Sequence, residues 1–449
     1  MLPALRQGVR CGVVRILARR HRVFYGWWIV GASFLLQALV GGLLFHGFSA
    51  YFLRVQDALK TSRTMVAAGL SLNRVESGLL GPLEGWAIDR WGPRPVVLLG
   101  SVLFGVGFIL FSFVNSPLAY FGAFAVLAAG SSLAGFTAVG TVVVAWFREK
   151  RSRALGIALS GIGAGGMLVP LLSWSIETFD WRATARASGL VILALGVPMA
   201  FVLRRSPERY GMHPDGAPPA PGAPALQTAT RALRSEAPAL GGRDFTAPEA
   251  LRAKAFWFLS LGHASALLVV GAVSVHQVPH MVQQMKLSLQ QAGNVVGFLT
   301  FMMVVGQVLG GYLGDRFDKR RILMACMGGH SLGLLFLAYA TSGWHLLAFG
   351  VLHGLAWGIR GTLLQAVRAD YFGLSSFGKI LGFANLISGI GQFFAPLFAA
   401  IVADTWGSYT PAFAILAVMA ALGSIFFLVA RKPVHRHAPG EQGGYAAPQ

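Results

Sequence analysis

Long apolar stretches separated by short polar segments make up most of this 449-residue chain. Each stretch has roughly 20 residues with few charges, which is the length a helix needs to cross a bilayer. The pattern predicts two sets of six transmembrane helices. The first set is 26–53, 65–88, 96–115, 118–146, 154–177 and 183–203, and the second is 255–280, 290–314, 322–341, 344–366, 378–400 and 408–430. The expected fold is an all-α membrane protein of twelve transmembrane helices in two pseudo-symmetric six-helix lobes. The fourth stretch is long enough to include a loop at one end.

The segment between the two sets, residues 204–253, is rich in proline, alanine and glycine. Such a composition buries too little apolar surface to fold tightly, so it predicts a flexible linker. The expected organisation is a basic tail at 1–25, an N-terminal lobe at 26–203, the linker at 204–253, a C-terminal lobe at 254–430 and a polar tail at 431–449.

The charge content fits a membrane protein and gives an orientation. Only 12% of residues are charged, against about 25% in soluble domains, which disfavours a soluble enzyme. Of the 37 lysines and arginines, 29 fall in the tails, the linker and the loops on their side, and 6 fall in the opposite loops. This bias predicts cytoplasmic N- and C-termini. It also explains the net charge of +20 without a nucleic-acid partner.

Neither a cofactor nor a metal is expected. The glycine-rich run at 161–166 lies inside an apolar helix with no preceding soluble strand, so it is not a dinucleotide site. His276 and His280 have a spacing compatible with a metal, but no carboxylate or thiolate accompanies them in the sequence. The glycines of the same helix (Gly156, Gly161, Gly163, Gly165 and Gly166) are interpreted as a helix-packing face.

A motif of glycine, aspartate and arginine recurs at matching points of the two halves. Its members are Gly85, Asp89, Arg90 and Arg94 in the first half, and Gly311, Asp315 and Arg316 in the second. A simple basic loop would explain the arginines but not the repeated pattern. Both stretches resemble the signature loops that follow helices 2 and 8 in the major facilitator superfamily, although Asp318 replaces the glycine corresponding to Gly92. This resemblance implies that the motif gates the cytoplasmic side.

Further stretches are similar to the branch of monocarboxylate transporters and oxalate/formate antiporters. They are residues 25–28, 145–158, 206–216 and 370–373, and the third is typical of bacterial members. The resemblance implies a secondary transporter of a small organic anion in a bacterial inner membrane, working by alternating access and coupled to protons or a counter-substrate. Animal members carry an aspartate and an arginine where Met303 and Gln307 stand here, and a lysine near His46, so their functional residues do not transfer.

Charges inside the membrane are costly and usually face a cavity or a partner. His353, Trp357 and Arg360 fall on one face of their helix, a stripe suited to an anionic ligand. The candidate substrate-binding residues are Arg360, His353, Trp357, Arg74, Asn73 and Gln37, and the candidates for coupling are Glu76, Glu84 and His46. A structural ion pair between Arg360 and Glu84 or Glu76 is the alternative for that arginine.

Two other functions remain open at this point. Efflux of apolar drug-like compounds would depend on aromatic walls more than on arginine. A transporter-like sensor would bind its ligand without net flux. In all three cases the expected partners are a small molecule and the lipid bilayer, and no enzymatic activity is expected.

Overall fold

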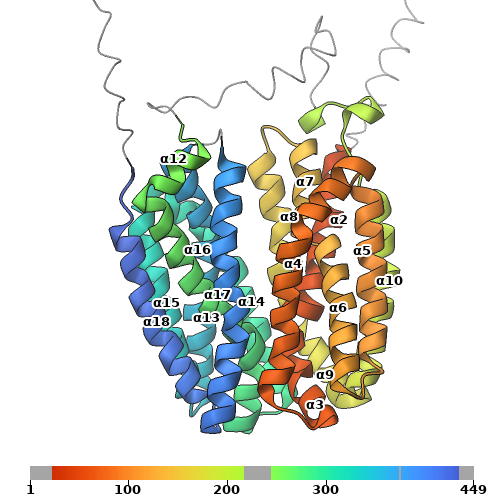
Figure 1. The fold of residues 1–449 in the computed structure, drawn as a ribbon, viewed down its shortest axis with the longest axis vertical. Coiled ribbons are helices and arrows are strands. Elements are labelled where there is room, and N and C mark those ends of the chain that lie inside the picture. Colours follow the sequence, from red (N-terminus) through yellow and green to blue (C-terminus); the bar gives the residue numbers. More distant parts are fainter. Residues whose placement is uncertain (1–22, 217–243, 374–375, 434–449) are drawn as a thin grey trace, which may run out of the picture.

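The computed structural model describes residues 23–216, 244–373 and 376–433, and these form two helical lobes that stand side by side (Figure 1). The N-terminal lobe contains α2 (Tyr25–Leu39), η1 (Val40–Phe45), α3 (Phe48–Leu59), α4 (Arg63–Trp91), α5 (Pro93–Phe111), α6 (Pro117–Leu133), α7 (Phe136–Trp146), α8 (Arg151–Gly166), α9 (Val169–Phe179) and α10 (Trp181–Val202). The C-terminal lobe contains α13 (Lys254–Gln284), α14 (Leu289–Arg316), α15 (Lys319–Ala338), α16 (Gly343–Phe372), α17 (Phe377–Trp406) and α18 (Thr410–Val429).

The prediction of twelve spans in two lobes is confirmed. Within the described residues, eleven helical segments are long and apolar enough to cross a membrane. The twelfth, α4, has 29 residues and is the span that carries Arg74, Glu76 and Glu84. Three of the twelve spans are interrupted: α2, η1 and α3 form the first, α6 and α7 the fourth, and α8 and α9 the fifth. The fourth span is therefore broken at Ala134–Gly135 rather than extended by a loop at one end.

Glycines allow a close approach of helices at the π-helical turn η1 in the first span. A side chain at Gly41 would collide with the backbone of Ile162, and one at Gly42 with the backbone of Gly165. Because both positions lack a Cβ, the first and fifth spans approach at backbone contact. Single π-helical turns in membrane helices often occur at functional sites, and this one ends directly before His46.

Both ends of the predicted linker are ordered parts of the lobes. The Asp215 carboxylate accepts hydrogen bonds from the backbone N–H groups of Arg148 (2.8 Å), Glu149 (2.9 Å) and Lys150 (3.2 Å), between α7 and α8. At the other end the Phe245 N–H donates to the Phe372 carbonyl (3.0 Å), just before the short helix α12 (Ala247–Arg252). The expectation of a flexible linker over the whole of 204–253 is corrected accordingly. Residues 217–243 lie outside the described part of the chain.

Candidate substrate site between and within the lobes

Arg360 lies in the core of the C-terminal lobe, where neutral histidines contact it. Its side chain is on α16 and the residue is 1% exposed. The guanidinium Nη1 lies 2.7 Å from Nδ1 of His263 on α13, and Nε lies 3.4 Å from Nε2 of His330 on α15. Among the described residues, ion pairs join Arg63 to Asp404 and Lys319 to Asp370, and none joins Arg360 to a carboxylate. The alternative of a structural ion pair with a glutamate is therefore not realised with any described carboxylate.

The donor chemistry of arginine fixes the tautomers of these histidines. A guanidinium has N–H donors and no acceptor, so both histidine nitrogens that face it must accept. His330 then carries its proton on Nδ1, which lies 3.1 Å from Nδ1 of His353 and donates to it. His353 in turn carries its proton on Nε2. Hydrogen bonds thus run in one direction, from Arg360 through His330 to His353.

The last group of this chain is a buried donor. Nε2 of His353 has no hydrogen-bond partner among the residues that the structure describes, and the residue is fully buried. An unsatisfied buried donor costs about 1–3 kcal/mol, so this N–H is a place where a ligand or a water would gain a hydrogen bond.

Trp357 connects this cluster to the N-terminal lobe. Its ring lies 6.1 Å from the His353 ring and 5.5 Å from the His46 ring, measured between centroids. Phe45, at the end of η1, contacts the same indole at 6.0 Å. The broken first span therefore places an aromatic pair of the N-terminal lobe against the helix that carries Arg360.

A second arginine adds positive charge to the same lobe. Arg368 is on α16, 2% exposed, and its Nη1 and Nη2 have no hydrogen-bond partner within the described ranges. Both Arg360 and Arg368 act electrostatically on His263. The interior of this lobe thus favours an anion.

The structure brings together some of the residues predicted from the sequence. His353, Trp357 and Arg360 lie in one region, as the helical spacing indicates, and His46 reaches the same indole from the other lobe. Gln37 is buried elsewhere, on the face of α2 that packs on Gly161, with its Oε1 unpartnered among described groups. Glu84 is buried on α4.

Other predicted residues are only partly described. The described part of the structure does not include the side chains of Asn73, Arg74 and Glu76. It also leaves out Gly85 and the side chains of Asp89 and Asp315 in the repeated motif. The motif's arginines stack on aromatic rings: Arg90 over Trp86 (5.7 Å), Arg94 over Phe201 (4.4 Å) and Arg316 over Tyr312 (4.2 Å). A side chain at Gly311 would meet open space.

The candidates chosen from the sequence did not include His263, His330 or Arg368. Each of them is a polar residue within an apolar helix, and this alone could have marked it as a candidate. The contacts with Arg360 come from two other helices, α13 and α15, and no spacing along one helix shows them.

His276 and His280 have structural partners in the C-terminal lobe. Nε2 of His276 lies 2.8 Å from the Pro396 carbonyl, and Nε2 of His280 lies 2.9 Å from the Leu337 carbonyl. Each therefore ties α13 to a neighbouring helix. No group of three or more His, Cys, Asp or Glu side chains within the described ranges is placed to hold a metal.

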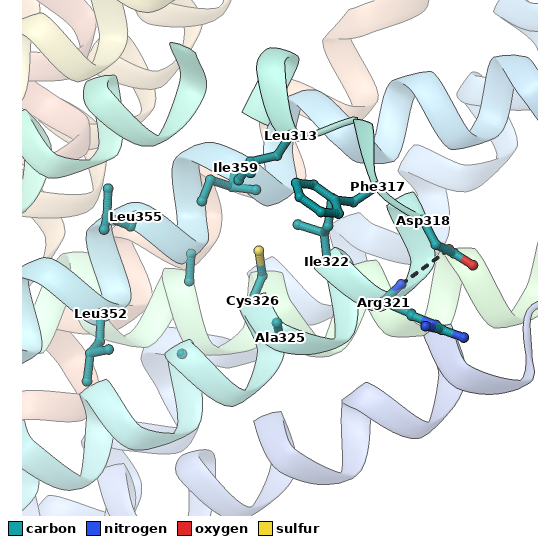
Figure 2. A pocket seen from close by; sticks show the side chains of 12 residues that line it. Leu313, Phe317, Asp318, Arg321, Ile322, Ala325, Cys326, Leu352, Leu355 and Ile359 are labelled. Atoms are coloured by element: carbon teal, nitrogen blue, oxygen red, sulfur yellow. Dashed lines mark hydrogen bonds between the residues drawn. The ribbon is translucent and has the colours of Figure 1, made fainter. Parts of the chain in front are cut away.

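A separate cavity of about 530 Å³ lies between α14, α15 and α16 (Figure 2). Its walls are mostly aliphatic, with Cys326 on one side and Leu355 and Ile359 on another, and Asp318 and Arg321 lie at its polar edge. Its lining includes none of the predicted site residues, and it borders the arginine cluster through Cys326, which acts electrostatically on Arg360.

The two lobes contact each other at the end opposite the linker. Arg63, the first residue of α4, pairs with Asp404 of α17 (3.5 Å) and donates to the Ala403 carbonyl (3.0 Å). The N–H and hydroxyl of Thr64 donate to the same carboxylate at 2.9 and 2.7 Å. Near the same end, the Gln290 N–H at the start of α14 donates to Glu177 on α9 (3.2 Å).

Two lobes of six spans, with buried charge beside their contact, define a membrane transporter of the two-lobed helical class. Residues 23–277 and 259–448 match the profile of the Major Facilitator Superfamily, and the chain belongs to this superfamily. It is 27% identical to human monocarboxylate transporter 11 over 425 residues, which cover 90% of this chain and 82% of that protein. It is 23% identical to the oxalate:formate antiporter of Oxalobacter formigenes over 409 residues, covering 87% and 88% of the two chains. The fold is similar to a crystal structure of a bacterial homologue of the human lysosomal transporter Spinster, with a TM-score of 0.64 and 15% identity over 91% of this chain and 96% of that one.

Proposed function

We propose that the protein transports a small organic anion, such as a monocarboxylate or dicarboxylate, by alternating access, coupled to protons or to exchange with a counter-substrate. The observation that carries the proposal is the burial of Arg360 without a carboxylate partner among the described residues. Histidine acceptors face its Nε and Nη1 but do not neutralise its charge. An arginine within a membrane helix costs at least about 2.5–3.5 kcal/mol on insertion scales. A substrate carboxylate would supply the missing negative charge.

The geometry of arginine suits this role. A guanidinium binds a carboxylate through two parallel N–H bonds, whereas lysine supplies a point charge without the fork. The similarity to transporters whose names specify monocarboxylates, oxalate and formate points to the same substrate class.

Access to Arg360 requires a change from the arrangement seen here. Trp357, one turn before Arg360, contacts His46 and Phe45 of the other lobe. Rocking of the lobes would separate these rings and uncover the arginine. The Asp89 and Asp315 motifs would gate the linker end, which faces the cytoplasm in the proposed topology.

Isothermal titration of purified protein with lactate, formate and oxalate tests the anion contact. We expect Arg360→Lys to raise the Kd by about tenfold or more, because the bidentate contact is lost. Arg360→Ala should abolish anion binding while neutral amides of the same acids bind as they do to the unaltered protein.

The melting temperature of the ligand-free protein separates the two roles of Arg360. Because no glutamate among the described side chains pairs with Arg360, Arg360→Lys should change this temperature little. A large drop that is rescued by neutralising Glu84 or Glu76 would show a structural ion pair and contradict the substrate contact.

A further inference from the structure

We infer that the His330–His353 pair binds a proton when an anion binds Arg360, so that one proton enters the site with each carboxylate. The inference rests on the proposed function, because it assumes that a carboxylate reaches this arginine. It assigns the proton to two residues of α15 and α16 instead of the sequence-based candidates Glu76, Glu84 and His46.

Arg360 occupies the histidine lone pair that a proton would need. Its Nε donates to Nε2 of His330, and His330 uses its other nitrogen as the donor to His353. In this state neither nitrogen of His330 has a free lone pair. A proton added here would replace the hydrogen bond with repulsion between two cations.

A carboxylate reverses this situation. When its oxygens accept the guanidinium N–H groups, Nε2 of His330 loses its donor and its lone pair becomes available. A proton from solvent then forms a new N–H bond at Nε2 while the O–H bond of its hydronium donor breaks. The resulting imidazolium N–H can donate to the same carboxylate. His330 thus changes from a competitor for the arginine into a second contact for the anion.

The charge of the cluster supports one proton per anion. Without ligand, Arg360 and the three histidines His263, His330 and His353 together carry one positive charge, that of the guanidinium. One carboxylate and one proton add no net charge, so a monocarboxylate would cross the membrane without moving charge. Because linked binding is reciprocal, protonation of the pair must tighten anion binding by the same factor by which the bound anion tightens proton binding.

His263 is the other histidine in contact with Arg360, and its surroundings favour protonation less. It lies near a second fixed cation, Arg368, as well as Arg360. The other titratable neighbours of the cluster are Cys326, which acts on Arg360, and Arg368 itself. Among these described groups, only His330 and His353 are joined by a hydrogen bond that can share an added proton.

Titration calorimetry in buffers of different ionisation enthalpy counts the protons taken up on binding. With lactate, formate or oxalate as the probe, we expect about one proton per anion and a Kd that rises roughly tenfold per pH unit above neutrality.

In His330→Gln, which keeps a donor and an acceptor but does not titrate, the anion should still bind with proton uptake near zero. His353→Gln should reduce the uptake as well. His280→Gln is the matched control. Like His330, His280 is buried and hydrogen-bonded, but its partner is the Leu337 carbonyl and it lies outside the cluster.

Each contrary result has a distinct meaning. Anion binding to the unaltered protein without proton uptake would overturn the inference and leave the proposed function standing, and this measurement depends on no variant. Loss of proton uptake in His263→Gln alone would overturn the assignment to the pair. Failure of all three probes to bind the unaltered protein would reject the proposed function, and the inference with it.

Discussion

At the level of single residues, one buried cation determines the state of its neighbours. Arg360 has donors only, so His263 and His330 must be neutral acceptors when they contact it. Several glycines are restricted in a similar way, because their neighbours leave no space for a side chain. On α8, a side chain at Gly161 would collide with the Phe34 carbonyl, and one at Gly165 with the Ala38 carbonyl. These contacts confirm the packing face interpreted from the sequence at these two positions.

We expect Gly165→Ala to lower the melting temperature clearly, because its Cβ would collide with the backbone of α2 and overpacking costs about 1–3 kcal/mol. Gly156→Ala is the control on the same helix, since nothing lies within 4 Å of a Cβ there. Thermal unfolding followed by tryptophan fluorescence measures both. Equal shifts for the two variants would show that helix propensity, and not this contact, sets the effect.

The sequence could identify site residues that share a face of one helix, because their spacing along the chain shows it. His353, Trp357 and Arg360 share a face because of helical spacing, and the structure places them together. His330 and His263 reach the arginine from other helices, which depends on how α13, α15 and α16 pack. One sequence contains no direct signal of that packing.

At the level of elements, the turn at Pro214–Gly216 attaches the start of the linker to the N-terminal lobe. Burial of Asp215 acts to raise its pKa, but the hydrogen bonds from the N–H groups of Glu149, Arg148 and Lys150, with the charge of Lys150, hold the pKa below its usual value. The residue has a left-handed backbone (φ 60°). This contact gives a structural reason for the proline, aspartate and glycine at 214–216, which the resemblance alone did not explain.

We expect Asp215→Ala to lower the stability of the lobe at neutral pH by about 1 kcal/mol, as typical for loss of a capping carboxylate. Because the folded-state pKa is lowered, the stabilisation is present above the unfolded-state value of about 3.9 and is lost as the pH falls through the folded-state value. Melting temperatures of the two proteins should therefore converge in acid. A difference that stays constant down to about pH 3 would contradict the carboxylate's role.

The interruptions of the helices could be anticipated only in part. A proline accompanies one of them, since α9 begins at Val169, one residue before Pro170. The break at Ala134–Gly135 and the π-helical turn at Val40–Phe45 carry no proline. Both lie at close backbone contacts with other helices, which hydrophobic periodicity does not report.

At the level of the whole molecule, contacts at the end opposite the linker hold the lobes together. Asp404 accepts the N–H groups of Arg63 and Thr64 at the start of α4, where the helix dipole favours negative charge. The twelve spans and two lobes were predictable from sequence because they follow from apolar length and repetition. The sequence could not predict which end of the lobes is in contact, since this depends on side chains that meet across the interface.

We expect Asp404→Ala to separate the lobes at this end. Loss of these partly exposed bonds should cost about 1–2 kcal/mol, enough to change the ratio of the two states by about 5- to 30-fold. The measurement is the distance between spin labels at Lys60→Cys and Trp406→Cys, with Cys11 and Cys326 replaced by alanine. Asp57→Ala, an exposed carboxylate of α3, is the control. An unchanged distance distribution in Asp404→Ala would show that this contact does not hold the lobes.

Uptake of radiolabelled lactate, formate and oxalate into proteoliposomes tests directly whether the protein transports these anions through Arg360. We expect at least one of these anions to accumulate or exchange in vesicles with the unaltered protein. We also expect Arg360→Lys to lower the rate by about tenfold at subsaturating substrate, since the bidentate contact is lost. Binding without accumulation or exchange would indicate a sensor. Transport by Arg360→Lys at the unaltered rate would contradict the assignment of this arginine as the anion contact.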